Sequence, residues 1–374
     1  FLANDIEFFE SYRYELDDYL SARDSEPLFS IFNIYRSRVL NRIDYALDLL
    51  EKPFDFSVDE VYPFDRTEAP WAIDTADLDD LWRRRVKNDY LILKLEDKAH
   101  SEISKTLKDR YQQQKRRILQ ISSQDVFQIV VNAYMSAIEP HTGYFSPRAT
   151  ENFKIRMSLS LEGIGAVLQA QNEYTVVQRV VPGGPAELEG SLRAGDRIIG
   201  VGQGDTESVV DVIGWRLDDV VDLIRGPKGS IVRLQIRSDP KTGNSGSRVL
   251  TLTRDEIKLE EQASQSSLLE VRDTEQIRRI GVIDIPTFYV DFDARSRGDA
   301  DYRSTTRDVR RLIRELEDEG IDGLIIDLRG NGGGALAEAT ALTGLFIDSG
   351  PVVQVRDARG RTRVNRDPSD DLAY

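Results

Sequence analysis

The chain has 374 residues, of which 40% are apolar and 31% charged, so it can bury hydrophobic cores in two or three domains. A formal net charge of −15 argues against a general nucleic-acid-binding protein. The absence of cysteine excludes disulfides, thiolate nucleophiles and cysteine-based zinc sites, and fits an oxidising compartment. No apolar run approaches the roughly 20 residues of a membrane helix, so we expect no transmembrane segment.

The first 150 residues predict a helical region. Apolar residues recur at helical spacing in four stretches, at residues 28–50, 78–86, 103–118 and 122–138. Such stripes are typical of a core rather than of a cofactor site. The two histidines, His100 and His141, lie in a polar helical stretch and in a turn, where packing or capping is a commoner role than ligation or base catalysis.

From Met157 the pattern changes to short β-rich stretches separated by glycine- and proline-rich turns. Residues 160–167 read S-L-E-G-I-G-A-V, with two glycines around one isoleucine just before a strand. Residues 217–224 predict a helix with one apolar face, and a Gly/Ser/Asn turn at 243–247 separates the last two strands. This order predicts a small β-barrel of about 100 residues.

Four short sequence elements follow one another in this region. They are G-I-G-A at 163–166, G-G-P-A at 183–186, L-R-A-G-D-R-I at 192–198 and R-G-P-K-G-S at 225–230. Together they resemble a PDZ domain of the kind found in C-terminal processing peptidases. The alternative, that the glycines of 163–166 only mark a tight bend, is weaker because all four elements are present.

The PDZ resemblance implies that the domain binds a free peptide C-terminus by β-augmentation. The loop amides would hold the terminal carboxylate, while the following strand and the helix at 217–224 would form the groove. The implied binding residues are Gly163, Ile164, Gly165, Ala166, Leu217, Val220, Val221 and Ile224.

The last third of the chain predicts an α/β fold. After a charged connection at 255–279, a strand, a helix and a second strand form a crossover unit, followed by a further helix and strand. Their ranges are 280–286, 305–319, 324–328, 335–346 and 351–355.

The second of these strands runs into G-N-G-G-G at 330–334, whose unshielded amides would attract a phosphate, a carboxylate or a reaction oxyanion. With the following alanine the run formally satisfies the dinucleotide fingerprint, and Asp348 or Asp357 would be the ribose partner. However, D-L-R-G-N-G-G-G at 327–334 also resembles the D-L-R-x-N-x-G-G signature of C-terminal processing peptidases, serine peptidase family S41. The resemblance extends to the first ten residues, to E-P-H-T at 139–142, where the group usually has aspartate in place of glutamate, and to P-V-V-Q-V-R-D at 351–357.

Membership of this family implies serine endoproteolysis by a Ser-Lys dyad, with Gly333 and Gly334 as candidate oxyanion donors. Arg225 matches an arginine that couples an occupied PDZ domain to the active site; an equally weighted alternative is a surface residue at a helix end. No lysine follows Lys258. The family's serine and lysine segments are therefore expected beyond Tyr374, and we expect this chain alone to be inactive.

The sequence thus predicts a multidomain α+β chain: a helical region at 1–150, a PDZ-like β-barrel domain at 157–258 and the first part of an α/β peptidase domain at 259–374. The resemblance implies a periplasmic, Gram-negative endopeptidase, on the inner-membrane face, that degrades envelope proteins with apolar free C-termini. The signal segment is expected outside the chain, which begins with Phe1. The resemblance also implies that the protein needs no metal or cofactor. It further implies that an outer-membrane lipoprotein adaptor docks on the helical region. The alternatives are a non-catalytic PDZ peptide-binding adaptor and, more weakly, a nucleotide-binding protein.

Overall fold

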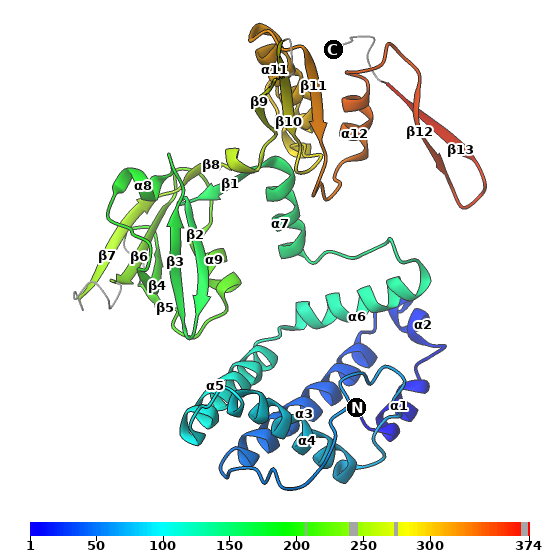
Figure 1. Ribbon diagram of the computed structural model, residues 1–374, viewed down its shortest axis with the longest axis vertical. Helices are drawn as coiled ribbons and strands as arrows, with labels where there is room; N and C mark the ends of the chain where they lie inside the picture. The colour runs from blue at the N-terminus through cyan, green and yellow to red at the C-terminus, as the bar shows by residue number, and fades with distance from the viewer. Residues whose placement is uncertain (206–207, 239–245, 273–275, 368–372) are drawn as a thin grey trace. The chain divides into compact units, whose positions relative to one another are not determined.

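The computed structural model describes residues 1–205, 208–238, 246–272, 276–367 and 373–374 (Figure 1). They divide into two compact units, Phe1–Ser146 and Pro147–Tyr374. Most of the turn predicted at 243–247 lies outside the described residues. No helix in the described ranges is both long and apolar enough to cross a membrane.

The first unit is helical, as predicted. Its helices are α1 (Ala3–Glu10), α2 (Leu16–Ser21), α3 (Glu26–Leu49), α4 (Thr75–Lys94), α5 (His100–Leu119) and α6 (Ser123–Ile138). Local sequence signals fix where several of them begin. Pro27 occupies the first turn of α3, and the side chain of Asp74 caps α4 by accepting from the Asp77 N–H. Ser122 and Asp125 form a capping box at the start of α6.

The core of this unit lies where α3, α4 and α5 pack together. Ile43, Val86 and Leu107 are fully buried there. Tyr111 is also buried, and its hydroxyl donates to Asp89 Oδ2 at 2.9 Å, which satisfies the only polar atom that this side chain brings into the core. The apolar stripes of these helices are therefore structural.

The second unit begins with α7 (Pro147–Ser158) and continues into a PDZ-like domain. Its elements are β1 (Ser160–Gly163), β2 (Ala166–Gln171), β3 (Tyr174–Val180), α8 (Pro185–Glu189), β4 (Arg197–Gln203), β5 (Val210–Asp211), α9 (Leu217–Ile224), β6 (Ile231–Arg237), β7 (Ser247–Thr253) and β8 (Asp255–Lys258). The main sheet has the order β2-β3-β4-β6-β7, with β5 beside β4.

The prediction of a barrel was wrong, because this sheet does not close. Strands β2 and β7 are its two edges in the described part of the chain, and β1 leaves the sheet to pair antiparallel with β8. Helix α9 packs against β2 and β4 and buries Val220 and Ile224 with the apolar side chains of the sheet. The helix thus supplies the burial that barrel closure would have supplied.

The rest of the second unit is α/β. It contains β9 (Gln265–Arg272), β10 (Ile277–Asp284), α10 (Phe292–Arg297), α11 (Thr305–Asp318), β11 (Gly323–Asp327), α12 (Leu336–Thr343), β12 (Pro351–Arg356) and β13 (Thr362–Arg366). Strands β10 and β11 are parallel and joined through α11, which confirms the predicted crossover.

The prediction of a charged connection at 255–279 was wrong, because these residues contain β8 and β9. Strand β9 pairs antiparallel with β10 over its whole length and forms an edge of the sheet β11-β10-β9. Most of its side chains are exposed, so charged residues are compatible with a strand there.

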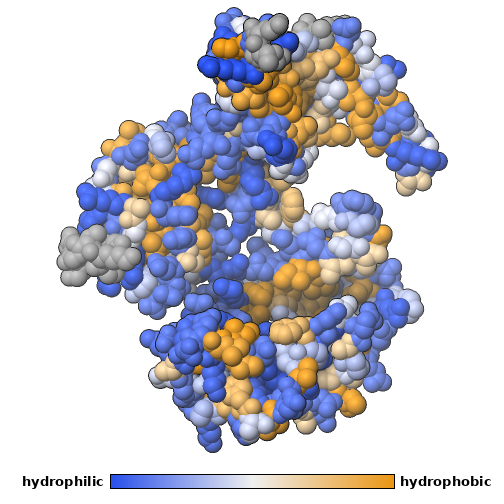
Figure 2. Space-filling view, in the orientation of Figure 1, coloured by the Kyte–Doolittle hydropathy of each residue, from blue (hydrophilic) through white to orange (hydrophobic). Residues whose placement is uncertain are grey.

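The two faces of the sheet β11-β10-β9 differ. Helix α11 covers one face, where Ile283, Ile313 and Leu316 are buried. On the opposite face Leu269 and Ile325 remain 49% and 48% exposed. Figure 2 shows apolar surface at the position of β11 and α12 in Figure 1.

Candidate functional site

The first candidate site is the loop at 163–166, which we call the carboxylate loop. It joins β1 to β2. The Ile164 side chain is buried in the domain core. The loop carbonyls are engaged: Ile164 O accepts from the Ala186 N–H at 2.9 Å, and Gly165 O from the Val181 N–H at 2.8 Å. The N–H groups of Ile164 and Gly165 donate to no acceptor in the described part of the chain, so they are available to an anion.

Glycine is required in this loop for two reasons. Gly165 has φ +73°, a conformation that costs other residues about 1–2 kcal/mol. A Cβ there would also lie 3.0 Å from the Cα of Gly184. The G-I-G-A and G-G-P-A elements therefore touch each other, which explains why both contain glycine.

Helix α9 packs beside β2, the strand that follows the carboxylate loop. One edge of β2 pairs with β3 and the other has no strand partner among the described residues, as β-augmentation requires. Of the four groove residues expected on α9, Val220 and Ile224 are 0% and 3% exposed and belong to the core. Leu217 and Val221 are partly exposed, and their i, i+4 spacing places them on one face of the helix.

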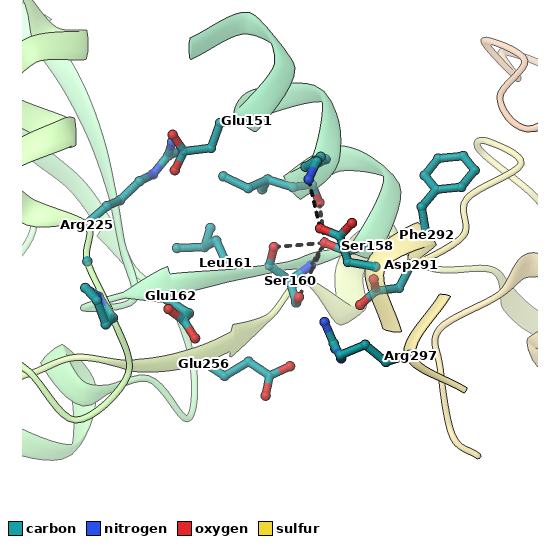
Figure 3. A pocket seen from close by; sticks show the side chains of 15 residues that line it. Glu151, Ser158, Ser160, Leu161, Glu162, Arg225, Glu256, Asp291, Phe292 and Arg297 are labelled. Carbon is teal, nitrogen blue, oxygen red and sulfur yellow. Dashed lines mark hydrogen bonds and ion pairs between the residues drawn. The ribbon is translucent and has the colours of Figure 1, made fainter. Parts of the chain in front are cut away.

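Arg225 follows directly on α9. Its Nη1 donates to Asn152 Oδ1 of α7 at 3.0 Å. The side chain lines a cleft of about 560 Å³ that is walled by α7, β1, the turn after α9 and the start of α10. Figure 3 shows Arg225 and Glu151 on one side of this cleft and Asp291, Phe292 and Arg297 on the other. The structure thus places Arg225 in the same cleft as α10, the first helix of the α/β part of the unit.

The second candidate site is the glycine loop at 330–334, which follows β11. Arg329 donates from Nη2 to Asp327 Oδ2 at 2.6 Å and from its backbone N–H to Asp327 Oδ1 at 3.0 Å. These hydrogen bonds, the side-chain one foremost, lower the pKa of Asp327 to about 2. The D-L-R part of the signature therefore forms a local ion pair at the entry to the loop.

Within the glycine loop the candidate donors differ. The Gly333 N–H already donates to Asn331 Oδ1 at 2.7 Å, and Asn331 Nδ2 donates to Ile285 O at 2.8 Å. Phe288 donates its N–H to Gly333 O at 2.8 Å and accepts from the Ala335 N–H at 2.9 Å. This is a parallel bridge centred on Gly334, so the Gly334 N–H faces away from Phe288. It has no acceptor among the described residues.

Only glycine fits at position 334. A Cβ there would lie 2.8 Å from the carbonyl carbon of Phe288 and 2.9 Å from its Cα, both backbone atoms, and φ is +141°. The segment at 288 and the glycine loop can approach this closely only because the side chain is absent.

The sequence analysis missed two residues in and after this loop. Asn331 fixes the loop through the contacts just described, whereas Glu338 joins α12 to the start of α11. Glu338 of α12 is 3% exposed, and its Oε2 accepts from Ser304 Oγ at 2.6 Å, from Thr306 Oγ1 at 2.9 Å and from the Thr306 N–H at 3.0 Å. A buried carboxylate is stabilised at the positive N-terminal end of α11. The sequence signal that could have identified Glu338 is its position as a lone glutamate in the apolar stretch 335–346.

The described residues contain no group of three or more His, Cys, Asp or Glu side chains placed to hold a metal ion. No lysine occurs after Lys258 in the 374 residues, so residues 259–374 supply no Ser-Lys dyad of their own. The structure thus presents two anion-accepting loops in one unit. In the first loop the N–H groups of Ile164 and Gly165 have no acceptor among the described residues, and in the second those of Gly330 and Gly334 have none.

Comparisons with known proteins agree with this arrangement. Residues 1–148 match the tail specific protease N-terminal domain, residues 152–237 the PDZ domain and residues 279–373 peptidase family S41. The chain therefore belongs to peptidase family S41 and contains a PDZ domain. The resemblance found from the motifs is confirmed.

Within this family the chain is similar to the tail-specific protease of Haemophilus influenzae, with 43% identity over all of this chain and 51% of that protein. It is 30% identical to the carboxy-terminal processing protease CtpA of Bacillus subtilis over 60% of this chain and 42% of that protein. The chain thus spans about half the length of these relatives or less. A crystal structure of the PDZ domain of a carboxy-terminal protease from Vibrio cholerae, in complex with peptide, is 58% identical over 27% of this chain and 100% of its own, with a TM-score of 0.26.

Proposed function

We propose that this protein acts in C-terminal processing: its PDZ domain captures a free, apolar C-terminus, and the peptidase domain to which residues 259–374 belong cleaves the captured protein as a Ser-Lys serine endopeptidase. The observation that carries the proposal is the pair of unengaged N–H groups of Ile164 and Gly165 next to β2, whose outer edge has no strand partner among the described residues. A terminal carboxylate is the anion that such a loop accepts beside an open strand edge.

In this binding mode the substrate adds a strand to the free edge of β2, and its carboxylate accepts hydrogen bonds from the carboxylate loop, from Gly163 to Ala166. These bonds are charge-assisted and hence stronger than neutral ones. Leu217 and Val221 contact the apolar terminal side chain. Val220 and Ile224 lie in the core beneath Leu217 and Val221 and do not contact the peptide themselves.

For cleavage, we assign the oxyanion donor to Gly334 in preference to Gly333. The reason is that the Gly333 N–H is held by Asn331, whereas the Gly334 N–H is free. A preorganised amide stabilises the negative charge that develops on the scissile carbonyl oxygen. The serine and its neutral lysine base lie outside residues 1–374 in this proposal, because no lysine follows Lys258.

The wider setting follows from the same family. We place the protein in the periplasm of a Gram-negative cell, at the inner-membrane face, where the absence of cysteine is suitable. Its substrates are envelope proteins with apolar C-terminal tails. The helical unit is the docking region for a lipoprotein adaptor of the outer membrane. Arg225, which lines the cleft next to α10, couples peptide binding to the peptidase part.

The test uses calorimetry on the 374-residue chain with a synthetic peptide that ends in a free apolar residue, and with the same peptide amidated. We expect saturable binding that weakens on amidation by a few kcal/mol at most, because charge-assisted hydrogen bonds are lost. Equal affinity for acid and amide would contradict the assignment of the carboxylate loop.

A second measurement addresses cleavage. We expect the 374-residue chain to bind this peptide without hydrolysing it, as followed by mass spectrometry. Turnover that disappears when one serine of the chain is replaced by alanine would overturn our placement of the dyad.

A further inference from the structure

Arg254, directly after β7, is a buried cation that the proposed function has not used. Its side chain is 3% exposed. All of its side-chain N–H groups find acceptors from two regions, the end of α9 and the strands beneath it. Nε donates to Ile224 O at 2.8 Å. Nη2 donates to Leu223 O at 3.0 Å and to Gln203 Oε1 at 2.6 Å. Nη1 donates to Ser230 Oγ at 3.0 Å and to Ile231 O at 3.2 Å.

None of these acceptors is a carboxylate. The positive charge lies instead against the last carbonyl groups of α9, where the helix dipole is negative and where helical carbonyls lack partners of their own. Burial lowers the pKa of the Arg254 guanidinium, but an arginine remains charged at neutral pH. Arg254 therefore caps the C-terminal end of α9 from inside the domain.

The surroundings are built to fit this side chain. Gln203 Nε2 donates to Leu223 O at 2.7 Å, so Arg254 and Gln203 hold the same carbonyl oxygen. Gly226 provides the space, because a Cβ there would lie 3.0 Å from both Cζ and Nε of Arg254. The glycine of the R-G-P-K-G-S element thus makes room for a residue 28 positions later in the chain.

Helix α9 depends on such anchors, because it has only eight residues and a helix of that length is marginal by itself. At its N-terminal part, Arg148 of α7 contacts Asp219 at 2.7 Å and Asp222 at 2.6 Å. These side chains are 31–42% exposed, and ion pairs of that kind contribute little. The buried cap at Arg254 is the stronger of the two restraints.

We propose that Arg254 is a positioning residue that fixes the end of α9 relative to β4 and β6 and thereby sets the distance between α9 and the free edge of β2, where the terminal side chain of the peptide would lie. The proposal rests on the proposed function, since it assigns a specificity role within the same groove. The adjacent residue Asp255 pairs with Gly163 at the start of the carboxylate loop, but Arg254 itself hydrogen-bonds to the end of α9 and to no residue of that loop in the described part of the chain. It therefore controls the preference for an apolar terminal residue and leaves carboxylate recognition unaffected.

The experiment measures dissociation constants of the 374-residue chain for three synthetic peptides that differ only at the C-terminus: leucine acid, serine acid and leucine amide. The variant is Arg254→Lys, which keeps the charge but cannot reach five acceptors. The control is Arg248→Lys in β7, an arginine that contacts Ser191, Ser238 and Asp196 and has no hydrogen bond to α9 among the described residues.

We expect Arg254→Lys to reduce the leucine-over-serine preference by about tenfold, the scale on which an apolar pocket discriminates. Its acid-over-amide ratio should equal that of the unmodified chain, and Arg248→Lys should leave both ratios unchanged. A general loss of stability would weaken all three peptides alike.

Three outcomes overturn the proposal: an unchanged leucine-over-serine preference in Arg254→Lys, an equal loss for all three peptides, or an equal effect of Arg248→Lys. If Arg254→Lys does not fold, Gln203→Leu removes the second hydrogen bond to Leu223 O and is expected to shift the same preference in the same direction. An unmodified chain that does not discriminate acid from amide would instead contradict the proposed function itself.

Discussion

The second unit contains two glycine-rich loops that look alike in sequence and differ in what they leave free. In the carboxylate loop at 163–166 the carbonyl groups are bonded inward and two consecutive N–H groups remain unengaged. In the glycine loop at 330–334 the N–H groups of residues 331, 332 and 333 are hydrogen-bonded, and those of Gly330 and Gly334, which are not adjacent, have no acceptor among the described residues. We propose a carboxylate for the first loop, whose two free N–H groups are adjacent, and a developing oxyanion at Gly334 for the second.

The sheets behind these loops differ as well. The PDZ-like sheet and α9 enclose a core in which Ile198, Val220 and Leu234 are fully buried. The sheet β11-β10-β9 has a covered face and an open one, on which Leu269 and Ile325 are half exposed. The carboxylate loop is thus anchored on a filled core. The glycine loop instead depends on specific hydrogen bonds of Asn331, Pro286 and Phe288.

The largest effect that would test this difference is expected from Gly334→Ala. The new Cβ would meet backbone atoms of Phe288, which cannot move aside as a flexible side chain would. We expect about 3 kcal/mol of local destabilisation, measured as faster hydrogen exchange of residues 285–289. Gly332→Ala is the control, because no atom lies within 4 Å of its Cβ position. Equal exchange rates in the two variants would show that the bridge does not hold the loop.

A smaller effect is expected from Gly165→Ala in the carboxylate loop. The left-handed conformation costs about 1–2 kcal/mol, and contact with Gly184 adds to it. Gly183→Ala separates the two contributions, since Gly183 has φ +74° but no atom within 4 Å of its Cβ position. Thermal unfolding should show the greater loss for Gly165→Ala, with weaker peptide binding only in that variant. The opposite order would refute the close packing of the two turns.

The smallest effect concerns the ion pair at the entry to the glycine loop. Arg329→Met should raise the pKa of Asp327 from about 2 toward the usual value near 3.9, as followed by NMR titration of its side chain. Because folding lowers this pKa, the pair stabilises the fold above the unfolded value and is lost as the pH falls toward about 2. Asp357, whose low pKa comes from Arg361, should not change. An unaltered Asp327 would mean that Arg329 is not its partner.

Much of the architecture could be predicted from local signals. Helical spacing gave α3 to α6, and the strand, helix, strand order of residues 280–328 gave the parallel pair β10 and β11. The charged stretch 255–279 could not be read as strand, because an edge strand with exposed side chains carries no apolar alternation. The open PDZ-like sheet could not be told from a barrel, because closure depends on where α9 packs.

The sequence by itself determined the family, the two glycine loops and the residue types that an anion site needs, because backbone conformation and motif spacing are local properties. Only the tertiary structure decided which amides are free, since that depends on acceptors distant in the chain, such as Phe288 for the loop at 330–334. It also decided that Val220 and Ile224 are core residues while Leu217 and Val221 reach the surface. Finally, it placed Arg254 under α9, a contact across 30 residues that no local pattern encodes.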